Sequence, residues 1–227
     1  MKIIEIHPGE NIMQESVDVI GLNGYIYGLQ NDTFDVYIND EIVIKDFPVL
    51  IFNQMNLPLK IPKISIRKKD IVKLNAPSAM PVIPIEKSIV LYTQLLNHEK
   101  KYRAYIKGAI QQMNGENFEI LIKVPPYQRY ILRTGAFFYY RENMNPSEVV
   151  NIKSRIKAYA DKNLIAEGTV DRIFYNPVFW KDMPEYEFEV KDILIIKGTP
   201  GYDNQSMTNI YYPWFVFVFE VVKDKEI

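Results

Sequence analysis

The stretch "YYPWFVFVFEVV", residues 211–222, is the longest apolar run in the chain and indicates which kind of fold to expect. It is far shorter than the ~20 residues that a membrane-spanning helix needs. Its aromatic and β-branched residues favour a strand. Because it is apolar at odd and even positions alike, both faces of that strand should be buried. We therefore expect a central strand, with Phe217 and its phenylalanine neighbours on one face and the intervening valines on the other.

The composition fits a β-rich globular protein. Of 227 residues, 48% are hydrophobic and 24% charged, and the 16 Tyr and 12 Phe favour strands. The length suits one large domain or two small ones. The formal net charge of −1 differs from the basic charge typical of non-specific nucleic-acid binders. The absence of cysteine excludes disulfide scaffolds, thiol catalysis and thiolate metal sites.

The start of the chain, "MKIIEIHPGE", lacks an apolar segment of signal-peptide length. With no membrane-length apolar run either, we expect a soluble, cytoplasmic protein that does not enter a membrane. The abundance of Asn, Ile, Lys and Tyr would suit a protein of a phage, virus or mobile element. In that case a virion-associated location is expected instead.

Alternating residues and turn signals predict two hairpins. Residues 17–44 alternate on both sides of Asn31–Asp32, a pair typical of turns. "FPVLIF", residues 47–52, is typical of a short buried strand. "KYRAYIKGAIQQM" and "NFEILIKV" are joined through Asn114–Gly115, which predicts the second hairpin. The two hairpins share a Tyr-Ile-x-Gly start. Either the sequence preferences common to hairpins or an internal duplication would explain this likeness.

Two segments have the spacing of helices. "PIEKSIVLYTQLLNHEK" keeps a 3–4 spacing of apolar residues after Pro84. "NPSEVVNIKSRIKAYADKN" begins with a cap, a proline and Glu148 in the arrangement of a capping box. The predicted fold class is therefore α+β and β-rich, with two sheet- or barrel-like lobes built from hairpins and about two helices, near 85–99 and 146–161.

Prolines mark the expected domain boundary. The stretch "NAPSAMPVIP" is rich in proline, which fixes φ and removes a backbone donor. We expect an N-terminal β lobe over 1–74, a Pro-rich linker or crossing over 75–84, and a C-terminal α+β lobe over 85–227.

One charged pattern resembles the core of PD-(D/E)xK nucleases. Glu187, Glu189 and Lys191 alternate along "EFEVK", Asp171 lies on the preceding predicted strand, and Glu148 begins the helix before it. The resemblance implies that carboxylates such as Asp171 and Glu189 hold Mg²⁺ while Lys191 stabilises developing charge. The proline expected before the aspartate is missing, and "GTPGYDNQSMTN" replaces the following helix. We favour the alternative, a solvated strand face with alternating charges.

The same region resembles PUA-like barrels of the EVE type. The segments "FFYYRE", "LIAEGTVDRIFY" and "YEFEVKDILII" carry this resemblance. It implies a pocket for a modified base, with Tyr175, Phe179 and Trp180 as candidate stacking residues. The predicted helix between the first two strands departs from that pattern. The favoured alternative is that these aromatic side chains cover a sheet.

A basic cluster is the remaining candidate binding site. It comprises Lys60, Lys63, Arg67, Lys68 and Lys69, with Lys73 nearby and Asp70 the single opposing charge within it. Such a cluster can contact phosphates. A charged edge strand that discourages aggregation is the commoner cause of this pattern.

These observations rank three classes of function. A non-enzymatic β-rich interaction or structural protein comes first, with a protein partner or self-assembly and with no cofactor or metal. A PUA/EVE-like nucleic-acid reader is the first alternative, and a PD-(D/E)xK-like metal-dependent nuclease is the second. Whether the chain is an enzyme stays open, and we favour a non-enzyme.

Overall fold

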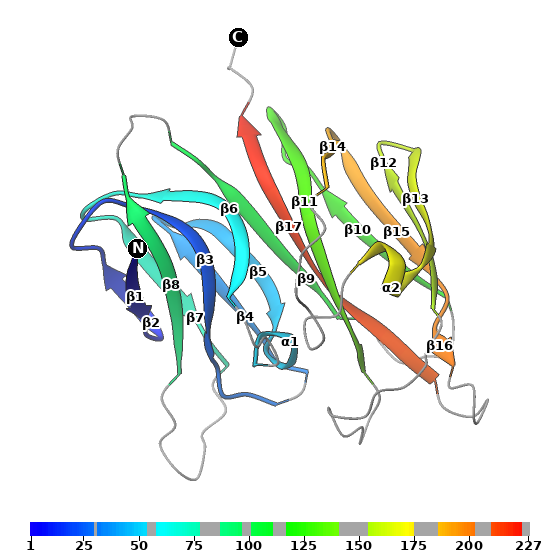
Figure 1. The fold of residues 1–227 in the computed structure, drawn as a ribbon, viewed down its shortest axis with the longest axis horizontal. Coiled ribbons are helices and arrows are strands. Elements are labelled where there is room, and N and C mark those ends of the chain that lie inside the picture. Colours follow the sequence, from blue (N-terminus) through cyan, green and yellow to red (C-terminus); the bar gives the residue numbers. More distant parts are fainter. Residues whose placement is uncertain are drawn as a thin grey trace. The chain divides into compact units, whose positions relative to one another are not determined.

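The computed structural model describes residues 1–29, 31–53, 58–77, 87–96, 101–110, 117–140, 154–174, 186–202 and 210–223. This part of the chain consists mostly of strands, with two short helices, α1 (Val49–Asn53) and α2 (Val170–Ile173) (Figure 1). It divides into two compact units, Met1–Gly108 with Val216–Val221 and Ala109–Phe215 with Val222–Ile227. The predicted β-rich class with two sheet-based lobes is confirmed. Neither helix is long and apolar enough to span a membrane.

The first unit contains two groups of paired strands. One is a four-stranded sheet in the order β1-β8-β3-β6, formed by β1 (Lys2–Ile6), β8 (Ser88–Leu95), β3 (Val17–Tyr25) and β6 (Leu59–Ile66). The other has the order β9-β5-β4-β7-β2, formed by β9 (Ala104–Ala109), β5 (Glu41–Pro48), β4 (Thr33–Ile38), β7 (Ile71–Asn75) and β2 (Gly9–Ile12). The rings of Phe34, Phe47 and Phe52 pack with centroids 4.9–5.4 Å apart. These buried rings join α1 to β4 and β5.

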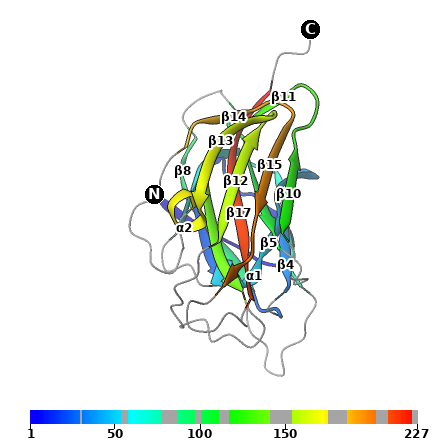
Figure 2. The same cartoon turned by 90° about the vertical axis from the view of Figure 1, so that its right-hand side faces the viewer.

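The second unit is built around a sheet in the order β10-β15-β12-β13 (Figure 2). Its strands are β10 (Phe118–Lys123), β15 (Ile193–Gly198), β12 (Arg155–Ala160) and β13 (Asn163–Thr169). The long strand β11 (Gln128–Tyr140) pairs with β14 (Phe188–Val190), and β16 (Gly201–Tyr202) pairs with β17 (Ile210–Lys223). Phe215 packs against Phe118 and Phe174, with ring centroids 6.0 and 5.5 Å apart. These aromatic rings form part of the core of the unit.

The apolar run near the C-terminal end forms β17, as predicted. This strand is hydrogen-bonded to β9 on one side and to β11 on the other. Every residue from Trp214 to Phe219 is buried. The expectation of a strand buried on both faces is confirmed, because a strand with neighbours on both sides can bury a continuous apolar sequence.

The helix predicted near 85–99 is wrong where the structure describes it. This segment contains the strand β8, in which Ile89, Leu91 and Thr93 are buried at every second position. Ile89 and Tyr92, which the helical spacing placed on one face, lie on opposite faces of the strand because they are three residues apart. Pairing with β1 on one side and β3 on the other overrides the local helical pattern.

The helix predicted near 146–161 is also wrong at its described end, while residues 146–153 lie outside the described part. Residues 155–160 form β12, where Ile156, Ala158 and Ala160 are buried and the residues between them are more exposed. This strand is hydrogen-bonded to β13 and to β15. Backbone pairing on both sides stabilises an extended conformation that the sequence did not reveal.

The predicted hairpins are wrong in their pairing. Strands β3 and β4 belong to different sheets, and so do β9 and β10. The described hairpin in the first region joins β4 to β5 through Asn39–Asp40, the second Asn-Asp pair, with φ of 48° and 65°. Two successive left-handed residues match the turn that suits a two-residue hairpin. The predicted strand over 47–52 is also wrong, because β5 ends at Pro48 and α1 follows.

The predicted linker at 75–84 lies mostly outside the described residues, and the boundary stays a prediction. Strand β8, which follows that segment, pairs with β1 and β3 in the first unit. The first unit therefore extends beyond residue 74 along the chain.

Candidate functional site

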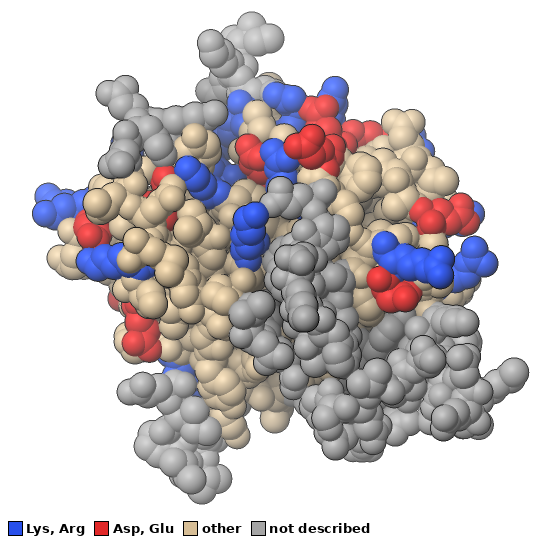
Figure 3. All heavy atoms as spheres, in the orientation of Figure 1, with Lys and Arg blue, Asp and Glu red and all other residues tan. Residues whose placement is uncertain are grey.

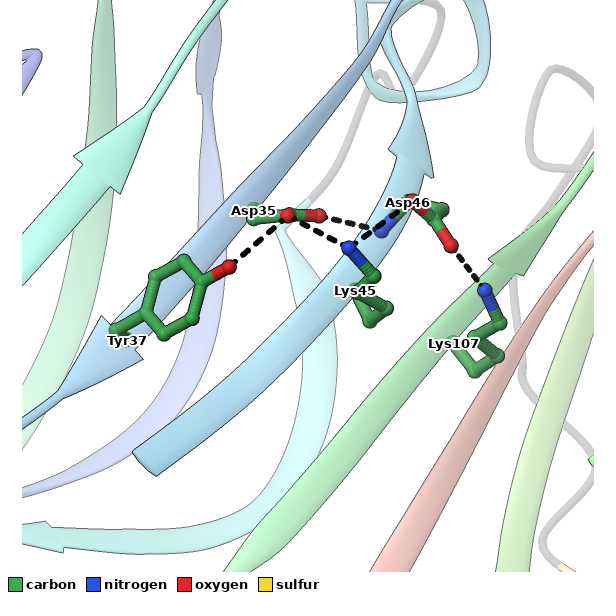
Figure 4. Close-up of polar contacts among 5 residues, drawn as sticks. All are labelled: Asp35, Tyr37, Lys45, Asp46 and Lys107. Carbon is green, nitrogen blue, oxygen red and sulfur yellow. Dashed lines mark hydrogen bonds and ion pairs between the residues drawn. The ribbon is translucent and has the colours of Figure 1, made fainter. Parts of the chain in front are cut away.

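A cluster of five polar side chains lies on β4, β5 and β9 of the first unit (Figure 4). The Lys45 ammonium lies 3.0 Å from Asp35 Oδ2 and 3.4 Å from Asp46 Oδ1. Lys107 forms an ion pair with the other carboxylate oxygen of Asp46. The Tyr37 hydroxyl donates a hydrogen bond to Asp35 Oδ2 over 3.3 Å, and the Asp46 backbone N–H donates to Asp35 Oδ1 over 2.7 Å. Each carboxylate is thus bound by at least one cation.

The backbone brings these residues together by an irregular pairing. The register of β4 against β5 shifts next to Asp35, and Asp46 has a φ of 51°. On its other side β5 runs parallel to β9, with Lys45 opposite Lys107. Gly108 permits this close approach, because an added Cβ would collide with the backbone oxygen of Asp46. The irregular strand therefore turns the Asp46 carboxylate toward Lys107.

The pKa values of Lys45 and Asp46 in this cluster, and of the nearby Tyr105, are shifted by their surroundings. The hydrogen bond to Asp35 raises the pKa of Lys45. Burial alone would raise the pKa of Asp46, but the hydrogen bond and charge of Lys107 together with Lys45 lower it. Burial, with the negative charge of Asp46, raises the pKa of Tyr105 on β9 to about 12. None of these three groups is set to exchange a proton near pH 7, as a general acid or base would be.

The residues of the nuclease-like pattern lie on separate elements. Asp171 is in the first turn of α2, Glu189 is on β14, and Lys191 is in the turn that follows. Glu189 accepts a hydrogen bond from Arg129 over 2.6 Å. The Lys191 backbone N–H donates to Asp161 over 2.8 Å. Within the described ranges, no group of three His, Asp or Glu side chains is placed to hold a metal ion.

The two glutamates of that pattern instead bind arginines of β11. Glu187 accepts a hydrogen bond from Arg133 over 2.9 Å, as Glu189 does from Arg129. Since β14 pairs antiparallel with β11, these are cross-strand ion pairs of the kind that stabilise a sheet. The catalytic roles suggested for Asp171, Glu189 and Lys191 stay a prediction.

The basic cluster is spread along β6 and the turn after it. Lys60 lies near the start of β6, and Arg67 lies directly after its end. Seven residue steps of ~3.3 Å along the strand separate the two by roughly 23 Å. The Lys63 ammonium lies 5.4 Å from the ring centre of Tyr102. Lys68 and Lys69 are exposed in the turn. The structure brings together the members near the turn and does not bring Lys60 to them.

The candidate base-stacking residues Tyr175, Phe179 and Trp180 lie outside the described residues. The proposed modified-base pocket therefore stays a prediction.

Sequence reasoning missed two carboxylates with well-defined partners. Asp161 accepts hydrogen bonds from the backbone N–H groups of Lys191, Asp192 and Ile193 over 2.8–3.0 Å. Asp18 is fully buried on β3 and accepts a hydrogen bond from the Ser65 hydroxyl over 2.8 Å. The available signal for Asp18 was its position inside the apolar run "VDVIG", where an acidic residue is unusual.

A groove of about 520 Å³ lies on the second unit. Its lining includes two ion pairs, between Lys157 and Glu167 over 3.1 Å and between Lys197 and Glu119 over 3.5 Å. Arg155 also lines it. Because all four paired side chains are about half exposed, these pairs are worth little individually.

The comparisons with known proteins concern the fold. No family model matches the chain, and no curated protein matches it. The extracellular domain of ANXUR2 from Arabidopsis thaliana is similar over 97% of this chain and 81% of that one, with 8% identity and a TM-score of 0.32. The STIV MCP is similar over 98% and 92%, with 7% identity and a TM-score of 0.46. A structure of infectious bursal disease virus, Gt strain, is similar over 96% and 58%, with 9% identity and a TM-score of 0.28.

Proposed function

We propose that the chain is a non-enzymatic, β-rich structural or interaction protein that binds either a partner protein or further copies of itself. The observation that supports this proposal is the pairing of strand-borne carboxylates with cations on neighbouring strands. Asp35 and Asp46 face lysines, and Glu187 and Glu189 face arginines. Carboxylates bound in this way stabilise sheets, which is a structural role.

An origin in a phage, virus or mobile element belongs to the same proposal. It rests on the abundance of Asn, Ile, Lys and Tyr in the chain. A virion-associated protein should be detected by mass spectrometry in purified particles of its source, and a cytoplasmic one in the soluble extract.

The first test asks whether the protein acts as a nuclease. The purified full chain, with Mg²⁺ or Mn²⁺, should leave single- and double-stranded DNA and RNA intact. Metal-dependent cleavage that Glu189→Gln abolishes would overturn the proposal. Glu187→Gln is the matched control, because that residue has the same kind of arginine partner next to the same strand, whereas the resemblance gives the metal-holding role to Asp171 and Glu189.

The second test determines whether the partner is a protein or a nucleic acid. Fluorescently labelled protein, sedimented in an extract of its source, should move faster than the monomer. Protease treatment of the extract should remove any shift caused by a partner protein, and nuclease treatment should leave it in place. A shift that nuclease removes would favour the nucleic-acid reader.

A further inference from the structure

The sheet β10-β15-β12-β13 presents a row of apolar side chains on its outward face. Leu121, Ile195, Tyr159 and Leu164 are directly opposite one another across the four strands. Leu121 and Leu164 are each 52% exposed, and the two between them are partly exposed. Because strand residues alternate, the buried residues between these positions, such as Ile120 and Leu194, lie on the opposite face. The row is thus an exposed apolar stripe across the sheet.

A row of charges runs parallel to this stripe, two residues away along β10, β15 and β12 and three residues away along β13, where the register shifts. It is formed by Glu119, Lys197, Lys157 and Glu167, again in direct register across the four strands. The two central lysines are opposite each other, which is unfavourable by itself. Each of them has a glutamate partner on the outer strand. The pattern Glu-Lys-Lys-Glu borders the stripe on one side.

On the other side of the stripe, two of the strands carry a charge that is opposite in sign to the charge that the same strand contributes to the Glu-Lys-Lys-Glu row. Along β10 the outward residues are Glu119, Leu121 and Lys123, and all three are exposed. Along β12 they are Lys157 and Tyr159, and Asp161 follows in the turn, where its carboxylate accepts hydrogen bonds from three backbone N–H groups. On both strands a negative and a positive residue therefore lie two positions from the apolar one, on either side of it.

This arrangement is self-complementary. A two-fold axis along the apolar row would place the row of one copy on the row of the other, as an isologous interface requires. The same rotation exchanges the two sides of the stripe. Glu119 of one copy then faces Lys123 of the other.

We infer that a second copy of this chain docks face to face on the outward side of this sheet, with Leu121, Ile195, Tyr159 and Leu164 at the centre of the contact. This inference rests on the proposed function, and it names the partner as the chain itself. The face is four strands wide at ~4.8 Å spacing and about six residues long at ~3.3 Å, roughly 400 Å² in outline. That is about half the ~800 Å² per partner of a standard interface, so the dimer is weak and forms at high protein concentration.

Sedimentation equilibrium of the full chain tests the inference. From ~5 to ~500 μM the protein should pass from monomer toward dimer. Leu121→Asp should leave a monomer over the whole range, because it places a charge in the apolar row. Ile3→Asp is the matched control, since Ile3 is also an exposed strand residue (58%) but lies on β1 of the first unit. The control should dimerise like the unmodified chain, and far-UV circular dichroism should show all variants folded.

Charge exchange gives a sharper test of the two-fold arrangement. Glu119→Lys or Lys123→Glu alone should weaken dimerisation about tenfold, because each creates two like-charge contacts across the axis. The double variant Glu119→Lys/Lys123→Glu should restore it. A monomer at every concentration, or a dimer that Leu121→Asp leaves unchanged, would overturn the inference. A monomer that still forms a protease-sensitive complex in extract would refute this inference alone, whereas metal-dependent cleavage would refute the proposed function.

Discussion

Asp18 illustrates how a single buried charge is accommodated in the first unit. Its carboxylate is fully buried on β3 and accepts a hydrogen bond from the Ser65 hydroxyl. The same hydroxyl oxygen accepts a hydrogen bond from the Tyr102 backbone N–H over 3.0 Å. Burying a carboxylate is costly unless it is hydrogen-bonded. Ser65 therefore links a buried charge on β3 to the chain segment before β9.

Ser65→Ala should destabilise the protein by ~1–3 kcal/mol, because it removes a hydrogen bond to a buried charge and leaves the Tyr102 N–H without its acceptor. Urea unfolding measures the change. Ser88→Ala on β8 is the control, since Ser88 is partly exposed, and it should stay within ~0.5 kcal/mol of the unmodified chain. Equal stability of the two variants would contradict the role of Ser65.

Asp161 makes stability depend on pH in a defined direction. Burial would raise the pKa of its carboxyl group, but hydrogen bonds from three backbone N–H groups outweigh burial and lower the pKa from its usual value of 3.8. A lowered pKa contributes stability above pH ~4, and this contribution is lost as the pH falls through the folded-state pKa. Asp161→Ala should therefore destabilise at pH 7 and pH 5, and the difference should shrink at pH 3. Urea unfolding at the three pH values measures it, and a difference that grows toward acid pH would contradict the assignment.

The approach of β9 to β5 depends on one glycine. A Cβ at Gly108 would collide with the Asp46 backbone oxygen, whereas one at Gly168 on β13 would meet only the Ile173 side chain at 3.7 Å. Gly108→Ala should therefore cost ~1–3 kcal/mol or more, as overpacking does, while Gly168→Ala should be tolerated. Thermal unfolding of both variants measures the contrast. Similar melting temperatures would show that β5 can move away from β9 without penalty.

The net charge of the chain, together with the mixed charges on one of its faces, argues against strong, non-specific binding to nucleic acid. On the face drawn in Figure 3, basic and acidic side chains of the described residues lie next to one another and form no single basic region. The net charge of the chain is −1. Where acidic side chains lie among the basic ones, as on this face, fewer counterions are released from a nucleic acid on binding.

Short single- and double-stranded nucleic acids should therefore show no binding at micromolar protein and ~150 mM salt in a fluorescence anisotropy titration. Binding that survives this salt and weakens with Trp180→Ala would instead support the modified-base reader, because stacking on an aromatic side chain is worth ~1–3 kcal/mol per base. Binding that Trp180→Ala leaves unchanged, but that the replacement of Lys68 and Lys69 removes, would indicate phosphate contact by the basic cluster.

The sequence by itself determined the β-rich class and the buried strand β17. Alternation with period two, as in residues 33–38, and apolar residues at every position, as in 214–219, are local properties of the chain. These patterns indicate which face of a strand is buried, and they do so regardless of which strand pairs with it. The burial of Asp18 was not predicted, because alternation places it on the face opposite Val17 and Val19, whereas all three are buried in β3.

Only the tertiary structure decided which strands pair and which charges meet. β8 and β12 became strands because neighbours on both sides bind their backbones, and no local spacing records those neighbours. The Asp46–Lys107 pair joins residues 61 positions apart. The apolar row with Leu121 at one end joins four strands from three separate parts of the chain. Period two specifies the orientation of a side chain but not the identity of the strand beside it, because every strand offers the same backbone donors and acceptors.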